Sequence, residues 1–545
     1  MTASQSKQSW SLTESGFITL TGEMIHSRSL LVSLLGFMTV SAASGLDLTL
    51  RHRVEREGEF GITEKRETWD PNETAVIVCD MWDSHHCLNA TKRGGEMAPR
   101  MNAVLKHARE QGSLIIHAPS SCLEFYKDHP ARSRAMSAPP AKNVPEGIEQ
   151  WLNWIDAREE AAGYPIDHTD GGEDDDAKAH EAWAKELAAR GRDPKAPWIR
   201  QTEGLTIDPD KDAITDDGVE NWNLLEQHGI KNVILLGVHT NMCVLGRPFG
   251  LRQMAKNGKN VVLMRDLTDT MYNPAMPPQV SHFRGTDLII EHVEKYVCPT
   301  ITSDQLIGGS PAHFRNDHRK NLVLLIGESE YHTAETLPAF AEKYLAEQFR
   351  IHVVNAHPEQ PNQFPGIEAL KHADVLCVSV RRRALPDDQL TLIRDFIAAG
   401  KPVVGIRTAS HAFSLRGAPA PEGHALWGRF DGAILGGDYH GHHGNEIATF
   451  AKAAETGMAH PILNGVTRSE FSTGGSLYEV SLLGRNTQVL LTGRAGDIAE
   501  HEPVAWTHHT QSGSRVFYTS LGHVKDFENP EFVTMLANAF DWVVQ

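Results

Sequence analysis

The sequence predicts an α/β protein of two domains, each a mostly parallel sheet with helices on both faces. Short apolar runs of strand length alternate with helical stretches, which is the pattern of parallel sheets covered by helices. This alternation occurs twice, and a stretch rich in Pro, Gly and His separates the two series. A chain of 545 residues is also too long for a single hydrophobic core.

We expect four regions along the chain. Residues 1–45 form an N-terminal extension, 46–305 the first domain, 306–320 a linker and 321–545 the second domain. A polar insertion, about residues 126–196, interrupts the first domain, and its acidic centre reads DHTDGGEDDD. We interpret this centre as a solvated loop that acts as a lid over a neighbouring pocket.

Apolar runs and helical periodicity order the elements of the first domain. In chain order we expect a strand ending at Asp80, a helix over 98–111, a strand over 113–120, a return to the sheet at 198–201, a helix over 219–228, a strand over 233–238, a helix beginning near Cys243 and a strand over 260–266. Residues 51–69 are interpreted only as a charged segment that leads into the first strand.

The second domain repeats the same alternation. Strands are expected in NLVLLIGES, RIHVVNA, ADVLCVSV and KPVVGIR, with helices over 337–349 and 387–399. From Gly475 onward the sequence is richer in strands and loops, including YEVSLL, TQVLLTG and RVFYTSLGH.

A short apolar segment near the N-terminus is typical of a secretory signal. After Met24, Arg28 supplies a basic start, residues 30–40 are apolar, and Ser41 and Ala43 suit a cleavage site. The run is too short to span a bilayer. We therefore expect translation to begin at Met24 and the product to be periplasmic or secreted. The alternative is a cytoplasmic protein in which this segment is a buried helix.

Charge and cysteine content exclude several classes. A net charge of -18 argues against a nucleic-acid partner, which would need clustered Lys and Arg. Six Cys in so long a chain, with no CxxC pair, predict neither a disulfide framework nor a zinc ribbon. No other segment has the length and apolarity of a membrane span. A small molecule is the expected partner.

Two reactive residues follow separate apolar strands. Cys243 follows the strand over 233–238, at a helix start whose positive end favours a thiolate. Asp80 follows another strand. Because ligands collect at the carboxyl ends of parallel strands, we expect the thiol and carboxylate to meet there as nucleophile and proton acceptor. In the alternative, Cys243 only fills space under a helix and Asp80 is solvated.

The segments AVIVCDMWD and GVHTNMCV resemble motifs of the isochorismatase-like cysteine hydrolases, which include nicotinamidases. The resemblance covers about residues 74–302 and implies hydrolysis of a small amide or a related C–N bond. It makes Cys243 the nucleophile and Asp80 the acid/base. It also implies a cis peptide at Val238–His239 and an oxyanion hole at the backbone N–H groups of His239 and Cys243. Family members are often oligomers, so a homo-oligomer is a further expectation.

The family's third catalytic residue is a Lys, and this sequence departs from that pattern. The corresponding region reads APWIRQTEGLTID, where Arg200 is the nearest cation; Lys195 and Lys211 are weaker candidates. An Arg can keep Asp80 ionised but does not readily release a proton. A degenerate site that only binds a small molecule or sugar is therefore an alternative function.

Further side chains near the two motifs are expected to line the substrate pocket: Trp82, Asp83, His85, His86, His117 and Phe125. The thiol mechanism requires no cofactor. Nicotinamidase-like members bind a divalent metal through Asp and His, so Asp83 and His85 with a further His form a candidate zinc-like site. A metal-dependent hydrolase that uses His85, His86 and His239 is a second alternative.

Four later segments resemble the trehalose-utilisation (ThuA-like) domain, a relative in fold of class I glutamine amidotransferases: LIGESEYHTAETLPAF, KPVVGIRTASHAF, GGDYHGHHG and PVAWTHHTQSGSRVFYTSLGH. Arg407 and Thr408 stand where the amidotransferases carry their Cys nucleophile, so we expect no thiol chemistry there. The resemblance implies a carbohydrate-like ligand. Its candidate binding residues lie in loops after strands: His332, His411, His440, His442 and His523.

Overall fold

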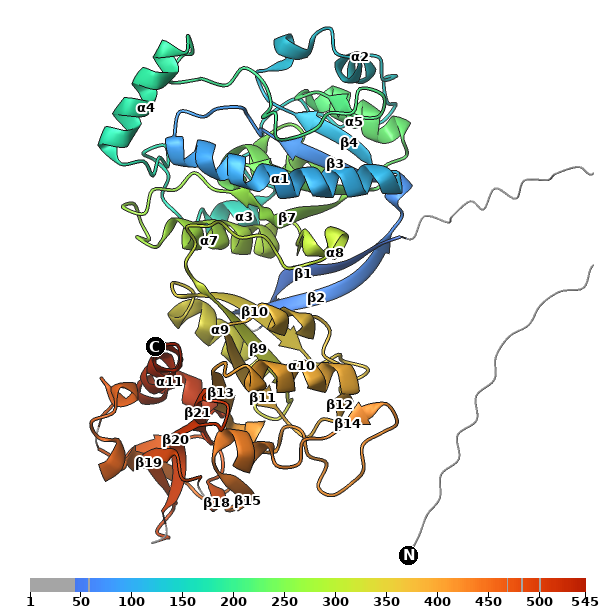
Figure 1. Ribbon diagram of the computed structural model, residues 1–545. Coiled ribbons are helices and arrows are strands. Elements are labelled where there is room, and N and C mark those ends of the chain that lie inside the picture. The colour runs from blue at the N-terminus through green and yellow to red at the C-terminus, as the bar shows by residue number, and fades with distance from the viewer. Residues whose placement is uncertain (1–44, 57–58, 468, 482–483, 499–500) are drawn as a thin grey trace, which may run out of the picture. The chain divides into compact units, whose positions relative to one another are not determined.

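Figure 1 shows the computed structural model of the chain. It describes residues 45–56, 59–467, 469–481, 484–498 and 501–545. The segment expected to be a secretory signal lies outside these residues. Across the described ranges, no helix combines the length and apolarity needed to cross a membrane.

The first half of the chain forms an eight-stranded sheet in the order β2-β1-β8-β7-β6-β3-β4-β5. Six strands run parallel, as predicted: β3 (Thr74–Cys79), β4 (Leu114–Ala118), β5 (Ala213–Ile214), β6 (Asn232–Val238), β7 (Asn260–Asp269) and β8 (Thr300–Ile301). The sheet resumes after the insertion at β5. Residue Gln201 makes only an isolated bridge to Trp82.

An antiparallel hairpin completes one edge of this sheet, where the sequence suggested only a charged lead-in. It consists of β1 (Leu46–Arg56) and β2 (Glu59–Trp69). Leu46, Leu48 and Leu50 are buried in alternation with polar residues. This period of two is the signal of a strand with one buried face.

Helices cover both faces of the first sheet, as the fold class predicts (Figure 1). They are α1 (Leu88–Gln111), α2 (Pro130–Met136), α3 (Ala157–Ala162), α4 (Ala177–Ala189), α5 (Gly218–Gln227), α6 (Leu251–Lys256), α7 (His282–Tyr296) and α8 (Asp304–Ile307). Helix α1 packs on one face, and α5, α6 and α7 on the other. Helix α1 begins at Leu88 rather than at residue 98 because the Asp175 carboxylate accepts from the N–H groups of Leu88 and Asn89.

The second half forms a nine-stranded sheet in the order β10-β9-β11-β13-β21-β20-β19-β16-β17. The parallel strands are β9 (Lys320–Gly327), β10 (Phe349–Asn355), β11 (Val375–Val380), β13 (Val403–Ile406) and β21 (Arg515–Thr519). The antiparallel strands are β16 (Thr449–Ala453), β17 (Phe471–Thr473), β19 (Thr487–Ala495) and β20 (Glu502–His509). Two small pairs complete the set: β12 (Leu385–Pro386) with β14 (His424–Ala425), and β15 (Asp438–His442) with β18 (Tyr478–Ser481).

Helices also cover both faces of the second sheet. Helices α9 (Thr333–Tyr344) and α11 (Pro530–Val543) share one core, and α10 (Asp387–Ala398) packs in the other. Helix α9 begins and ends earlier than its predicted range of 337–349. At its start the Glu328 carboxylate accepts from the Thr333 N–H, and at its end Phe349 is needed as the first residue of β10.

Candidate functional site

The carboxyl ends of β3 and β6 bring Asp80 and Cys243 together. The two strands are parallel neighbours, so their following residues reach the same edge of the sheet. Asp80 has a φ of 46° and is 0% exposed. Cys243 lies in a π-helical turn over Thr240–Val244 and is 8% exposed. The charges of Asp80 and Arg247 both act on its thiol, which places the three side chains near one another.

The Asp80 carboxyl has a different partner on each oxygen. Oδ1 accepts from the Ser120 N–H at 2.8 Å, at the end of β4. Oδ2 faces Arg247 Nε at 3.4 Å. Burial raises the pKa of Asp80, and the Arg247 charge opposes this rise. The carboxyl is therefore fixed beside the thiol by one backbone donor and one cation.

The structure places Arg247, rather than Arg200, next to Asp80. Arg200 pairs with Glu203 at 2.6 Å and with Asp83 at 3.5 Å, and its guanidinium lies over Phe125. The weaker candidates Lys195 and Lys211 are exposed. Sequence reasoning missed Arg247 because it followed the family's Lys position. The usable signal was the spacing of four residues after Cys243, which puts both side chains on one side of a helical turn.

The environment of Cys243 does not favour a thiolate, contrary to the expectation from a helix start. Burial raises the pKa of the thiol, the Asp80 charge raises it further, and only Arg247 among the main contributors lowers it. Desolvation and a neighbouring carboxylate thus outweigh the helix end. The folded site therefore favours the protonated thiol of Cys243.

The bend after β6 contains the cis peptide that the family resemblance implies. The Val238–His239 peptide is cis. The His239 carbonyl accepts from the N–H groups of Met242 and Val244, which closes the turn that carries Cys243. Burial lowers the pKa of His239 to about 4, so its imidazole is neutral at physiological pH.

Stacked rings adjoin this bend. The rings of Trp82 and Trp198 lie 4.7 Å apart, His85 lies 5.8 Å from Trp198, and His85 lies 4.8 Å from His239. His86 contacts His85 at 4.0 Å. Burial also lowers the pKa of His85. The cluster offers flat apolar faces and neutral imidazoles, which suit an uncharged planar ligand.

Two residues expected in the pocket lie apart from this cluster. His117 is inside β4, where its ring nitrogens bond Gln201 Oε1 and Asp212 Oδ2, each at 3.0 Å. Phe125 is 53% exposed. Both positions follow from packing of the insertion, which the sequence could not locate.

The candidate metal ligand Asp83 is engaged by arginines. Arg192 pairs with it at 2.8 Å, and Arg200 at 3.5 Å. In the described ranges, the group whose ligand atoms gather within 4.8 Å is Cys87, Asp174 and Asp175, without Asp83 or His85. Asp174 in that group pairs with Arg93 at 2.7 Å. Since Asp83 faces cations, these residues do not fit a metal held by Asp83 and His85.

The insertion packs against the segment that carries Cys243. Leu152 N–H donates to the Gly246 carbonyl at 2.8 Å, and Trp151 lies over Arg247 at 5.4 Å. His168 Nδ1 bonds Asn241 Nδ2 at 2.9 Å. The acidic centre is not simply solvated, because Asp174 is ion-paired and Asp175 caps α1. The insertion is therefore a fixed cover over this part of the sheet.

Replacing Trp151 by Ala is expected to make Cys243 more accessible. The indole covers Arg247, so its removal opens one side of the site. Iodoacetamide should then modify Cys243 faster than in wild type, as followed by peptide mass spectrometry. Trp154→Ala is the matched control, because Trp154 stacks on Arg252 instead. Equal rates of Cys243 alkylation in both variants would show that Trp151 does not control access of iodoacetamide to Cys243.

In the second half, the predicted histidines do not form one cluster. His411 is buried after β13, its Nδ1 lies 3.0 Å from Ser410 Oγ, and its ring lies 4.7 Å from Tyr439. His332, His440 and His442 are exposed. His523 caps the turn after β21 through the Lys525 N–H. His411 is thus the buried member of the predicted set.

Arg407 occupies the turn where amidotransferases carry a thiol. Its φ is 43°, it is buried, and its guanidinium donates to the Ser520 carbonyl at 2.7 Å. The same group lies over the rings of Tyr331 and Tyr478. The turn begins at Arg407, directly after β13.

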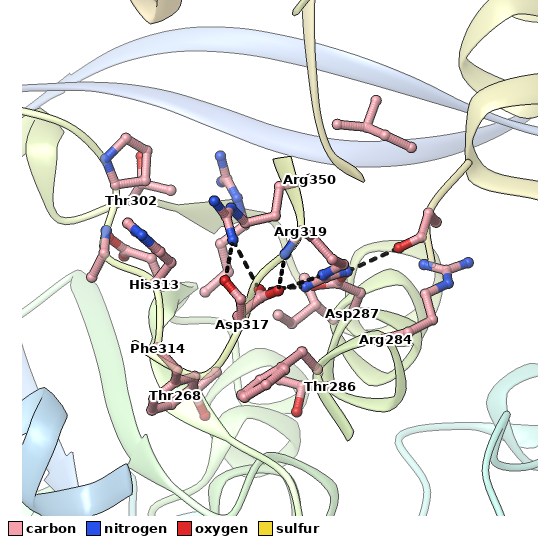
Figure 2. Close-up of a pocket in the computed structure, with 18 of the residues that line it drawn as sticks. Thr268, Arg284, Thr286, Asp287, Thr302, His313, Phe314, Asp317, Arg319 and Arg350 are labelled. Carbon is pink, nitrogen blue, oxygen red and sulfur yellow. Dashed lines mark hydrogen bonds and ion pairs between the residues drawn. The ribbon is translucent and has the colours of Figure 1, made fainter. Parts of the chain in front are cut away.

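A cavity of about 210 Å³ lies elsewhere, beside Asp317 and Arg319 (Figure 2). Asp317 pairs with Arg319 at 2.8 Å and with Arg350 at 3.4 Å. Arg319 also pairs with Asp287 at 2.6 Å. These charges satisfy one another, which is typical of a structural network rather than of a site that awaits a ligand.

Residues 322–543 match the family model ThuA, described as trehalose utilisation. The match confirms the resemblance predicted for the second half of the chain. No curated protein matches the chain.

Solved structures resemble each half separately. A putative ThuA-like protein from Bacteroides uniformis is 17% identical and covers 43% of this chain and 96% of that chain, with a TM-score of 0.33. A cysteine hydrolase from Pseudomonas syringae is 17% identical over 44% and 93% of the two chains, with a TM-score of 0.26. An isochorismatase family protein from Burkholderia thailandensis is 14% identical over 43% and 94%, with a TM-score of 0.24. These likenesses are too distant to decide activity.

Proposed function

We propose that the first half of this chain is a cysteine hydrolase of small molecules that cleaves an amide or a related C–N bond. The observation that carries the proposal is that Asp80, ion-paired with Arg247, and Cys243 follow the carboxyl ends of the neighbouring parallel strands β3 and β6. A thiol, a proton acceptor and a cation at the carboxyl edge of a parallel sheet are the parts that acyl transfer needs.

The reaction proceeds in two halves. As Cys243 Sγ attacks the carbonyl carbon, Asp80 accepts the thiol proton, and the oxyanion forms beside the bend at His239. Asp80 then gives that proton to the leaving nitrogen, the C–N bond breaks and a thioester remains on Cys243. Water attacks the thioester with Asp80 again accepting a proton. The acid leaves, and the thiol regains its proton.

The electrostatics of the resting site support this order of events. A buried thiol beside a carboxylate keeps its proton until attack begins, because the two negative charges would repel. Arg247 stabilises the carboxylate form of Asp80 and does not need to give up a proton itself. Backbone donors at His239 and Cys243 would each contribute about 2.7–4 kcal/mol to stabilising the oxyanion.

The proposal is tested by trapping the thioester. The full chain is mixed with a panel of small substrates (nicotinamide and N-carbamoyl amino acids), acid-quenched within the first turnovers and analysed by intact and peptide mass spectrometry. We expect one substrate to release product and leave its acyl mass on the Cys243 peptide. Turnover of an amide with the added mass on another residue would refute the nucleophile assignment.

Replacing Arg247 by Gln is expected to impair hydrolysis more than replacing Arg200. Without Arg247 the pKa of Asp80 rises, so less of it is ionised at a given pH and the acidic limb of the pH–rate profile moves upward. Loss of a charge-assisted contact of about 1.5–3 kcal/mol lowers kcat/KM by about tenfold to a hundredfold.

The controls for this prediction are Arg200→Gln and Arg247→Lys. Arg200 pairs with the exposed Glu203, and exposed pairs contribute only about 0–1 kcal/mol, so its loss should change turnover little. Arg247→Lys should restore part of the activity and return the pH limb toward wild type. If Arg200→Gln proves the more damaging change, the functional cation lies at Arg200.

A further inference from the structure

A second cavity, of about 260 Å³, lies in the second half of the chain. Arg382 after β11 and Ser410 and His411 after β13 form one side, at the carboxyl ends of parallel strands. Asp431 and Asp438 also line it. The volume is below the ~300–1,000 Å³ of pockets for drug-sized ligands, so the cavity suits a compact molecule.

The cationic side of this cavity lacks internal partners. Neither Arg382 nor Arg416 forms an ion pair within 4.0 Å with any described residue, although the adjacent Arg381 is paired with Glu330 at 2.7 Å. Arg382 Nε is shielded from solvent and has no hydrogen-bond partner in the described ranges. The charges that most affect His411 are those of Arg382, Arg381, Arg416 and Arg407, all cationic.

These arginines differ from those at the cavity of Figure 2, where Asp317 and Asp287 neutralise Arg319. A guanidinium without a carboxylate partner is a ready receptor for an external anion, because its planar fork matches the two oxygens of a carboxylate or phosphate. Two such groups at one mouth would otherwise repel each other. Arg416 is indeed among the groups that lower the pKa of Arg382.

The cavity also has acidic groups in its lining. Asp431 accepts from the N–H groups of Gly432 at 2.8 Å and Tyr439 at 3.3 Å, and Asp438 lines the same cavity. Carboxylate oxygens accept hydrogen bonds from hydroxyl groups. The ring of Tyr439, with its centroid 4.7 Å from that of His411, adds a flat surface to the lining.

We propose that this cavity binds an anionic monosaccharide, with its carboxylate or phosphate held by Arg382 and Arg416 and its hydroxyls held by Asp431 and Asp438. His411 and Ser410, on the same side as Arg382, contact the ring of the sugar. The inference concerns a site separate from Cys243, so it stands or falls independently of the hydrolase proposal.

Calorimetric titration of the full chain tests the proposal. The probes are D-glucuronate, D-glucose 6-phosphate, D-glucose and inorganic phosphate. We expect one anionic sugar to bind at least about tenfold more tightly than glucose, since one charge-assisted contact contributes about 1.5–3 kcal/mol. Preference for glucuronate assigns a carboxylate ligand, and preference for the sugar phosphate assigns a phosphate ligand.

Variants locate the binding. Arg382→Gln and Arg416→Gln should each weaken the anionic sugar by about tenfold or more and leave binding of glucose unchanged. Arg429→Gln removes the same charge from a nearby exposed residue that does not line the cavity, and it should bind as wild type. Thermal unfolding of each variant separates lost contacts from lost fold. Cys243→Ala should bind the sugar as wild type does.

Four results would overturn the inference. Equal affinity for glucose and the anionic sugars would show that the arginines do not bind the anionic group of the ligand. Unchanged binding in folded Arg382→Gln and Arg416→Gln places the ligand elsewhere. Inorganic phosphate binding as tightly as glucose 6-phosphate reduces the site to a simple anion site without a sugar. Absence of binding by all four probes excludes this ligand class.

Discussion

Cys243→Ala is expected to abolish hydrolysis, with kcat/KM falling by at least about 10⁴-fold. Its thiol is the nucleophile of the proposed reaction, so without sulfur no thioester forms. The fold should persist, because the side chain is small and Ala fits the same turn. Steady-state release of the product acid or ammonia gives the rate, and circular dichroism with thermal unfolding reports the fold.

Cys298→Ala is the matched control for this variant. Cys298 is buried in the same apolar core as Cys243 but lies after α7, away from the Asp80 carboxyl. It should lose stability to a similar degree and keep its turnover. Retained hydrolysis in Cys243→Ala would instead leave the first half with a binding or metal-dependent role.

The parallel strands of both sheets could be predicted because each strand is a continuous apolar run in the sequence. Strands β3 and β6 are continuous apolar runs. Asp80 directly follows β3, and Cys243 lies in the turn after β6. Parallel pairing then forces Asp80 and Cys243 to one edge. The family resemblance added the cis peptide at Val238–His239, which no local pattern in the sequence indicates.

The supporting residues depend on packing that the sequence does not reveal. Arg247 reaches Asp80 because the π-helical turn orients it, and Trp151 from the insertion holds its outer face. Arg200 occupies the expected stretch of sequence but is drawn to Glu203 and Asp83. The sequence analysis expected a cation at this edge of the sheet. The packing of the folded chain decides which arginine supplies it.

The pKa of Cys243 also depends on packing that the sequence does not reveal. A helix start favours a thiolate in isolation, but the folded site removes water from the Cys243 thiol and adds the charge of Asp80. In the second half, histidines stood out in the sequence, whereas the buried atoms without a hydrogen-bond partner in the described residues include the Nε atoms of Arg382, Arg383 and Arg407. The sequence shows the type of each residue, but it does not show which side chains the fold removes from water.

Asp80→Asn is expected to slow hydrolysis and at the same time make Cys243 more reactive toward a small alkylating agent. Without its base the enzyme should lose about 10²–10⁴-fold in kcat/KM. The Asp80 charge raises the pKa of Cys243, and Arg247 remains to lower it, so the thiol of the variant ionises at lower pH than in wild type. At a fixed pH near 7.5 a larger thiolate fraction gives faster reaction with iodoacetamide.

The opposite directions of these two effects separate a proton acceptor from a purely structural residue. Asn is close to Asp in shape and can still accept from the Ser120 N–H, so access to the sulfur should not change. Arg247→Gln provides the contrast, because it removes the charge that lowers the pKa of Cys243 and should slow both hydrolysis and alkylation. Alkylation that slows in Asp80→Asn, or hydrolysis that persists there, would show that the carboxyl does not control the thiol proton.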